Sequence, residues 1–174
     1  ALDAVATKRI YEAKDRPSDN PMIVHVASIE MLNGVASGVT DAQKAIMSKL
    51  WPGPITFVLR KNPAVPDVTT GGLDTVAVRW PSRREAAEII EAAGVPIAAP
   101  SANLSGKPSP TTFEDVAEDM DGRIDAIVKG ERTAIGIEST VLDLTSEVPT
   151  ILRPGFITKS QIEEAVDGEV RYDP

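Results

Sequence analysis

Apolar residues recur along this chain with two periods that alternate, which predicts interleaved helices and strands. The helical period of three to four positions predicts helices over residues 3–14, 40–50, 82–93, 111–121 and 158–166. Short apolar runs predict strands over residues 22–26, 55–59, 75–80, 95–100, 124–128, 139–144 and 150–152. Because the two kinds of element alternate over mostly short connections, we expect an α/β domain with a twisted, mixed or largely parallel sheet flanked by helices.

Several of the predicted helices carry start and stop signals. The capping-box spacing, a hydroxyl residue followed three positions later by Glu or Gln, marks the start of four predicted helices. The pairs are Thr40 with Gln43, Ser82 with Glu85, Thr111 with Glu114, and Thr158 with Gln161. In the first helix, Leu2, Val5, Ala6, Ile10 and Ala13 are expected to form the apolar face.

Composition narrows the function classes. The 174 residues fit one domain, and 42% hydrophobic content is ordinary for a globular protein. The formal net charge of −8 and the 4% of aromatic residues disfavour broad phosphate binding and a stacking platform for nucleic acid. With no cysteine and one histidine, neither a thiolate metal site nor a histidine cluster is expected. There is no apolar run of about 18 residues and no signal peptide, so the prediction is a cytoplasmic protein without a membrane span.

The ends of the chain also carry expectations. The first residues already follow a helical pattern and lack an initiator Met, so the chain is expected to begin inside a domain. We assign residues 1–168 to that domain and residues 169–174 to a tail or the start of a linker.

A pair of cations follows the first predicted helix. Lys14 and Arg16 stand two residues apart, just before Pro17. Cations suit a helix C-terminus, so a solvated helix end is one interpretation. The other is an anion clamp, because Lys supplies a point charge and Arg a planar fork for phosphate or carboxylate.

Three further polar segments lie at the ends of predicted strands, where ligands gather in open α/β sheets. They are "APSANLSGKPSPT" from Ala99, "GIESTVLD" from Gly136 and "LRPG" from Leu152. The first can cradle an anion with small hydroxyls and backbone N–H groups, or form an ordinary serine-rich turn. It lacks the spacing of a phosphate-binding P-loop. In the other two, Ser139 is either an ordinary strand residue or a site residue, and Arg153 is either a surface arginine or a second phosphate contact.

Other polar residues are ambiguous on their own. His25 and Arg79 each lie in an apolar strand and fit either a structural or a binding role. His25 falls on the strand face opposite Val24. No Ser-His-acid set can be assembled, and Glu138 has no evident partner as a base.

Together these segments resemble a known family. The series "KRIYEAKDRPSDNPMIVHV", "LWPGPITFVL", "VAVRWP", "PIAAPSANLSGKPSPT", "GIESTVLDL" and "ILRPG" is similar to the YrdC-like domain of threonylcarbamoyl-AMP synthases, over about residues 3–167. The family's upstream "TETVYGLG"-like loop has no counterpart here, and some members carry a second carboxy-terminal domain.

The resemblance implies a fold, a reaction and a site. The fold is the YrdC-like three-layer arrangement with a large concave pocket. The reaction joins L-threonine, bicarbonate and ATP into threonylcarbamoyl-AMP and pyrophosphate, for threonylcarbamoyl-adenosine in tRNA, with Mg²⁺ carried by the phosphates and tRNA or tRNA-modification proteins as possible partners. The residues that match ATP-binding positions are Lys14, Arg16, Asn20, Thr75, Ser101, Asn103, Ser109 and Arg153. Those that match L-threonine-binding positions are His25, Arg79, Ala99 and Ser139.

The resemblance implies neither a covalent intermediate nor a protein metal site. Lys14 and Arg16 are expected to stabilise charge. The alternative function is an RNA-binding module with the same fold and no synthase activity.

Overall fold

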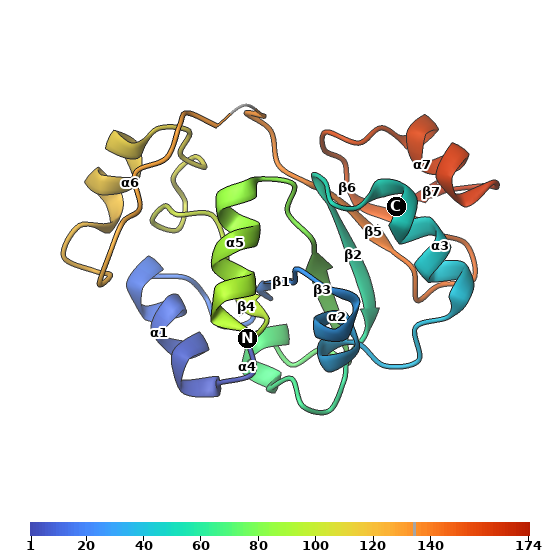
Figure 1. Cartoon of the computed structure of the whole chain (residues 1–174), viewed down its shortest axis with the longest axis horizontal. Helices are drawn as coiled ribbons and strands as arrows, with labels where there is room; N and C mark the ends of the chain where they lie inside the picture. The colour runs from blue at the N-terminus through green and yellow to red at the C-terminus, as the bar shows by residue number, and fades with distance from the viewer. Residues whose placement is uncertain (134) are drawn as a thin grey trace.

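The computed structural model describes residues 1–133 and 135–174 and has the predicted α/β architecture (Figure 1). Among these residues, seven strands form one sheet in the order β4-β1-β3-β2-β5-β6-β7. The pairs β1/β3, β2/β5 and β6/β7 are parallel, whereas β1/β4, β2/β3 and β5/β6 are antiparallel. The sheet is therefore mixed, as expected.

The elements have the following bounds. The strands are β1 Ile23–His25, β2 Ile55–Arg60, β3 Thr75–Arg79, β4 Ile97–Ala98, β5 Thr140–Asp143, β6 Thr150–Arg153 and β7 Arg171–Tyr172. The helices are α1 Ala4–Lys14, α2 Ile29–Val35, α3 Asp41–Leu50, α4 Asp67–Thr70, α5 Arg84–Ala93, α6 Phe113–Met120 and α7 Lys159–Val166. In Figure 1, α1 lies beside α4 at one end of the molecule, and α3 lies beside α7 at the other.

The main core lies along the central strands. Phe57, Ile55 and Leu142 are fully buried, and they belong to the neighbouring strands β2 and β5. Trp51 packs edge-on against Phe57, with ring centroids 4.9 Å apart. Burial of these large side chains is the main contribution to the stability of the sheet.

Two of the four predicted capping boxes are confirmed, those of Thr40 with Gln43 and of Thr158 with Gln161. The other two predictions are wrong. Helix α5 begins at Arg84 without a side-chain cap, since Ser82 lies two residues before it. Helix α6 is capped one residue later than predicted, by Thr112, whose hydroxyl accepts from the Asp115 N–H.

The apolar face predicted for α1 is only partly formed: Ile10 packs against a small cluster with Tyr11, whereas other predicted members are exposed. Leu2 and Val5 are 41% and 63% exposed, whereas Thr7, Tyr11 and Lys14 are buried. These three polar side chains find hydrogen-bond partners inside the protein, which removes the cost of burying them.

The strand predicted over residues 124–128 is not formed. Ile124 and Val128 are 41% and 75% exposed, so no neighbouring strand covers this apolar run. The sequence patterns did not reveal α2, α4 or β7, which are short. Strand β7 lies within residues 169–174 and pairs with β6, while the assignment of this segment as a tail or linker stays a prediction. No helix in the described ranges is long and apolar enough to cross a bilayer.

Candidate functional site

A cavity of about 1180 Å³ opens where the polar loops leave the sheet. Ten of the twelve residues predicted for the site line it: Arg16, Asn20, His25, Thr75, Arg79, Ala99, Ser101, Ser109, Ser139 and Arg153. They come from segments far apart in the sequence that the sheet brings together. Lys14 and Asn103 are not among the lining residues.

His25 and Arg79 are neighbours at the ends of two parallel strands. The register of β1 and β3 pairs their Cα positions directly. Val24 is fully buried and His25 is only partly so, which confirms that His25 lies on the other face of β1. Burial first, and the Arg79 charge second, lower the pKa of His25 to about 4, so the imidazole is neutral at pH 7. Among the described residues its Nδ1 has no hydrogen-bond partner, although that atom is buried.

Arg79 and Arg153 place two guanidinium groups in the same cavity. Arg79 donates from Nε to the carbonyl oxygen of Gly53 at 3.3 Å. Burial and the neighbouring charge of Arg153 lower the pKa of Arg79. Because the positive charges of Arg79 and Arg153 repel each other, an anion that binds between them is stabilised by both.

Arg153 is fixed by Ser139, the residue directly before β5. Its Nη2 donates to the carbonyl oxygen of Ser139 at 2.8 Å and to Oγ of the same residue at 3.2 Å. The Ser139 hydroxyl lies 2.9 Å from that of Thr56 on β2. The backbone after β6 can pass this close to the backbone before β5 because residue 155 is glycine. A Cβ there would lie 2.5 Å from the carbonyl oxygen of Glu138.

Arg16 and Asn20 form one end of the cavity. The Arg16 Nη2 donates to Asn20 Oδ1 at 2.6 Å and to the carbonyl oxygen of Pro21 at 3.1 Å. Tyr11 supports the loop from below, because its hydroxyl lies 2.9 Å from the Asn20 carbonyl oxygen and 3.1 Å from that of Val68. The sequence did not identify Tyr11 as a residue that supports the site, since it stands outside the polar loops.

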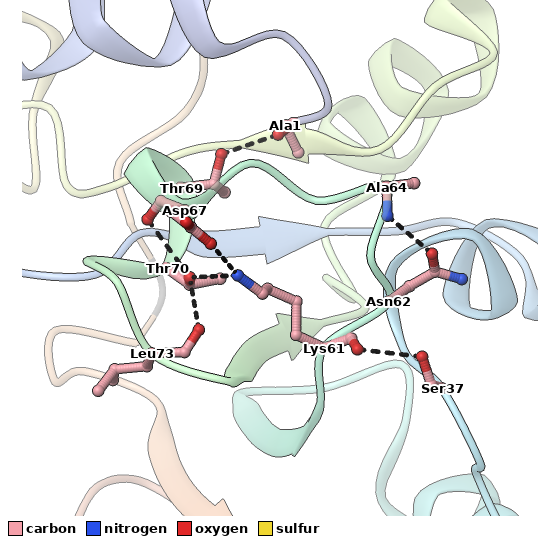
Figure 2. Close-up of polar contacts among 9 residues, drawn as sticks. All are labelled: Ala1, Ser37, Lys61, Asn62, Ala64, Asp67, Thr69, Thr70 and Leu73. Atoms are coloured by element: carbon pink, nitrogen blue, oxygen red, sulfur yellow. Dashed lines mark hydrogen bonds and ion pairs between the residues drawn. The ribbon is translucent and has the colours of Figure 1, made fainter.

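Helix α4 holds the same loop from the other side. A Cβ on Gly71 would lie 2.7 Å from the carbonyl oxygen of Asp19, and the φ of Gly71 is +62°. Figure 2 shows how α4 is fixed: Lys61 Nζ pairs with Asp67 Oδ1 at 2.5 Å and reaches Thr70 Oγ1 at 3.5 Å. These contacts position the turn that leads into β3 and Thr75, a link that no sequence motif indicated.

Lys14 lies beneath the serine-rich loop. Its buried ammonium group donates to the backbone carbonyl oxygens of Ser101 and Asn103, and its own carbonyl oxygen accepts from the Ser105 N–H at 2.9 Å. Asn103 is also buried and donates to the carbonyl oxygen of Lys107 at 2.8 Å. Burial, together with the nearby Arg16 charge, lowers the pKa of Lys14. In this arrangement Lys14 and Asn103 shape the loop that presents Ser101.

The lining of the cavity carries more positive than negative charge. Five cationic side chains face three anionic ones: Arg16, Arg79, Arg83, Lys129 and Arg153, against Glu85, Glu131 and Glu138. The excess is notable in a chain with a formal net charge of −8. A concave site of this kind favours small anionic ligands over a broad nucleic-acid surface.

A family model supplies the deciding comparison. The model named Sua5_yciO_yrdC, described as "Telomere recombination", matches residues 1–155. The chain belongs to this family. The resemblance predicted from the sequence motifs is therefore confirmed.

Curated relatives agree with this assignment. The chain is 52% identical over 174 residues to a protein of Pyrococcus abyssi named threonylcarbamoyl-AMP synthase, with 100% of this chain and 51% of that protein covered. It is 53% identical to a Bacillus subtilis protein of the same name, covering 99% of this chain and 50% of that one. The chain thus spans about half the length of these relatives.

Solved structures show the same fold. The crystal structure of P. abyssi Sua5 complexed with L-threonine matches with a TM-score of 0.96 and 53% identity, covering 100% of this chain and 51% of that one. Escherichia coli YciO matches with a TM-score of 0.81 at 24% identity, covering 92% of this chain and 78% of that one, and supports the fold alone.

Proposed function

We propose that the cavity is the site of a threonylcarbamoyl-AMP synthase, which joins L-threonine, bicarbonate and ATP and releases pyrophosphate. The single observation that carries the proposal is the meeting of His25, Arg79 and Ser139 with Arg16 and Arg153 in one cavity. The high similarity to a Sua5 protein crystallised with L-threonine supports it.

L-Threonine is proposed to bind at the sheet end of the cavity. Arg79 can fork onto the amino acid's carboxylate with two parallel hydrogen bonds. Neutral His25 and the Ser139 hydroxyl offer uncharged partners for the threonine hydroxyl. Ala99 borders this region, and its N–H is engaged by the carbonyl oxygen of Ile23 at 3.0 Å, which fixes its backbone.

ATP is proposed to bind along the loops. Arg16 and Arg153 supply charge for the triphosphate, and hydroxyl or amide groups come from Asn20, Thr75, Ser101 and Ser109. Lys14 adds positive charge from beneath the serine-rich loop, and Asn103 holds that loop in shape. Positioning and fixed charges of this kind lower the barrier without a covalent intermediate.

The proposed chemistry has two steps. The neutral threonine amine attacks the carbon of CO₂ and loses a proton, or attacks bicarbonate with cleavage of a C–O bond and loss of water, and forms a carbamate. A carbamate oxygen then attacks the α-phosphorus of ATP, the bond from that phosphorus to the bridging oxygen breaks, and pyrophosphate leaves with the electron pair. The cationic lining stabilises the charge that develops on the phosphate oxygens.

Mg²⁺ is proposed to arrive with the nucleotide. In the described part of the chain there is no group of three or more His, Asp or Glu side chains suited to hold a metal ion. Mg²⁺ commonly keeps several waters and binds through substrate phosphates, and those contacts suit this site.

The product is proposed to serve threonylcarbamoyl-adenosine formation in tRNA, in the cytoplasm, with tRNA-modification proteins as candidate partners. An RNA-binding module without synthase activity is the other function considered. The concave, locally cationic cavity and the acidic chain give it no support.

Pyrophosphate release from ATP by the purified chain tests the proposal. We expect release that requires both L-threonine and bicarbonate and falls at least about tenfold in Arg79→Ala, the loss of one charge-assisted contact. Arg123→Ala is the matched control, because Arg123 is exposed and pairs with Asp15 outside the cavity lining. Equal pyrophosphate release with and without L-threonine would contradict the proposal.

A further inference from the structure

Glu138 is the anion that already lies against the proposed phosphate-binding residues. Its Oε2 pairs with Arg153 Nη1 at 2.7 Å, and its Oε1 accepts from the Ser109 hydroxyl at 3.4 Å. Both partners are residues we assign to ATP. One carboxylate thus engages a guanidinium and a hydroxyl, which are also typical donors to a phosphate oxygen.

The position of Arg153 does not depend on Glu138. The Nη2 and Nε atoms of Arg153 donate to the Ser139 carbonyl oxygen at 2.8 and 3.3 Å, and Nη1 makes the ion pair with Glu138. Removing the negative charge of Glu138 therefore leaves the guanidinium held in place, with one of its nitrogens released for another anion.

The backbone of Glu138 is held at the cavity edge. Its carbonyl oxygen accepts from the Phe156 N–H at 3.3 Å, and Gly155 packs directly against the same peptide. The side chain itself is accessible, with 54% of its surface exposed, and so is that of Arg153, with 39% exposed. The carboxylate can therefore swing into solvent while the backbone stays where it is.

We propose that the Glu138 carboxylate competes with the phosphates of ATP for Arg153 and Ser109. It occupies these two side chains until the nucleotide displaces it. The proposal rests on the function proposed above, and it deepens that function by naming a residue that sets nucleotide affinity. Nucleotide binding breaks the Glu138 ion pair and places two anions near each other, so wild-type affinity lies below what the cations alone would give. The same competition favours departure of pyrophosphate after the reaction.

Glu138→Gln tests this inference, because glutamine keeps the shape of the side chain and removes its charge. We expect the Kd for ATP and for inorganic pyrophosphate to fall about two- to fivefold, a range set by the modest strength of exposed ion pairs. Isothermal titration calorimetry measures the Kd of each ligand, with and without Mg²⁺. A melting temperature like that of the wild type would verify that the variant is folded.

Two controls make the test specific. Glu91→Gln removes the same charge from an exposed position on α5 that is not among the described lining residues. It should leave both dissociation constants unchanged. In an Arg153→Ala background, Glu138→Gln should lose most of its gain, since the cation for which Glu138 competes is gone.

Each other outcome overturns the inference. Unchanged affinity in Glu138→Gln, or an equal gain in Glu91→Gln, would show that Glu138 does not compete locally. Weaker binding only when Mg²⁺ is present would make Glu138 a metal-facing ligand instead. If the wild type bound neither ATP nor pyrophosphate, the proposed function would fail first, and the inference with it.

Discussion

Arg153 on β6 donates two hydrogen bonds to the carbonyl oxygen of Ser139, which directly precedes β5, and this relationship joins the two halves of the proposed site. Ser139 is assigned to threonine and Arg153 to ATP. In the proposed function, the contact would therefore fix the distance between L-threonine and the phosphate that its carbamate must reach. Such preorganisation is what a reaction catalysed by positioning requires.

Replacing Arg153 should separate nucleotide binding from threonine binding. Arg153→Ala removes a charge-assisted contact to phosphate, so we expect ATP affinity to fall about 10- to 100-fold. Threonine affinity should fall less than ATP affinity, because His25 and Arg79 stay in place and Ser139 loses only the hydrogen bonds that Arg153 donates to it. Calorimetric titrations of each ligand check this, and an equal loss for both would contradict the division of the site.

Gly155 should tolerate no side chain. In Gly155→Ala the Cβ would lie 2.5 Å from two backbone atoms, so we expect a loss of about 1–3 kcal/mol in unfolding free energy and a further loss of activity. Urea unfolding measures the change in unfolding free energy, and pyrophosphate release measures the change in activity. Gly34→Ala is the control, since nothing lies within 4 Å of its Cβ and α2 should gain up to about 1 kcal/mol.

Gly71 should couple α4 to the loop that carries Asp19 and Asn20. Gly71→Ala forces the Asp19 carbonyl to move, so we expect weaker ATP binding as well as lower stability. Gly38→Ala separates the two effects. Gly38 has the same φ of +62° with nothing within 4 Å, so it should show the backbone cost of about 1–2 kcal/mol alone. Equal ATP affinities in the two variants would contradict the coupling.

His25 should make stability depend on pH in a defined window. Its pKa is about 4 in the folded protein and about 6.5 when unfolded, so the unfolded chain binds the additional proton between these values. Stability from this group is present above pH 6.5, declines as the pH falls, and is lost below pH 4, for a total of about 3–4 kcal/mol. Urea unfolding of wild type and His25→Gln at pH 4.5 and 7 isolates the effect, because the other titrating groups are common to both. Parallel pH profiles would contradict it.

Most strands of the sheet followed from the sequence because they depend on local patterns, whereas the predicted site residues came from the family resemblance. Val24 and His25 alternate in burial as a strand requires, and the motifs around Arg79, Ser101 and Arg153 stand where strands end. The registers that bring these ends together are long-range pairings. Only the family resemblance could anticipate them.

Other features depended on tertiary contacts that no periodicity encodes. Tyr11 and Lys14 are buried because polar partners from distant loops meet them, so α1 turns a polar stripe inward. Glu138 had no evident partner in the sequence, and the structure places it 2.7 Å from Arg153. The run at residues 124–128 is apolar but lacks a neighbouring strand, so local propensity did not decide its structure.

Transfer of label from bicarbonate tests the central claim most directly. The purified chain would be incubated with ¹³C-bicarbonate, L-threonine, ATP and Mg²⁺, and the products separated and weighed by mass spectrometry. We predict a labelled species that contains threonine, the carbonyl carbon and AMP together, absent when threonine is omitted and strongly reduced in Arg79→Ala. Binding of ATP and threonine without any such species would contradict the claim that this cavity joins them.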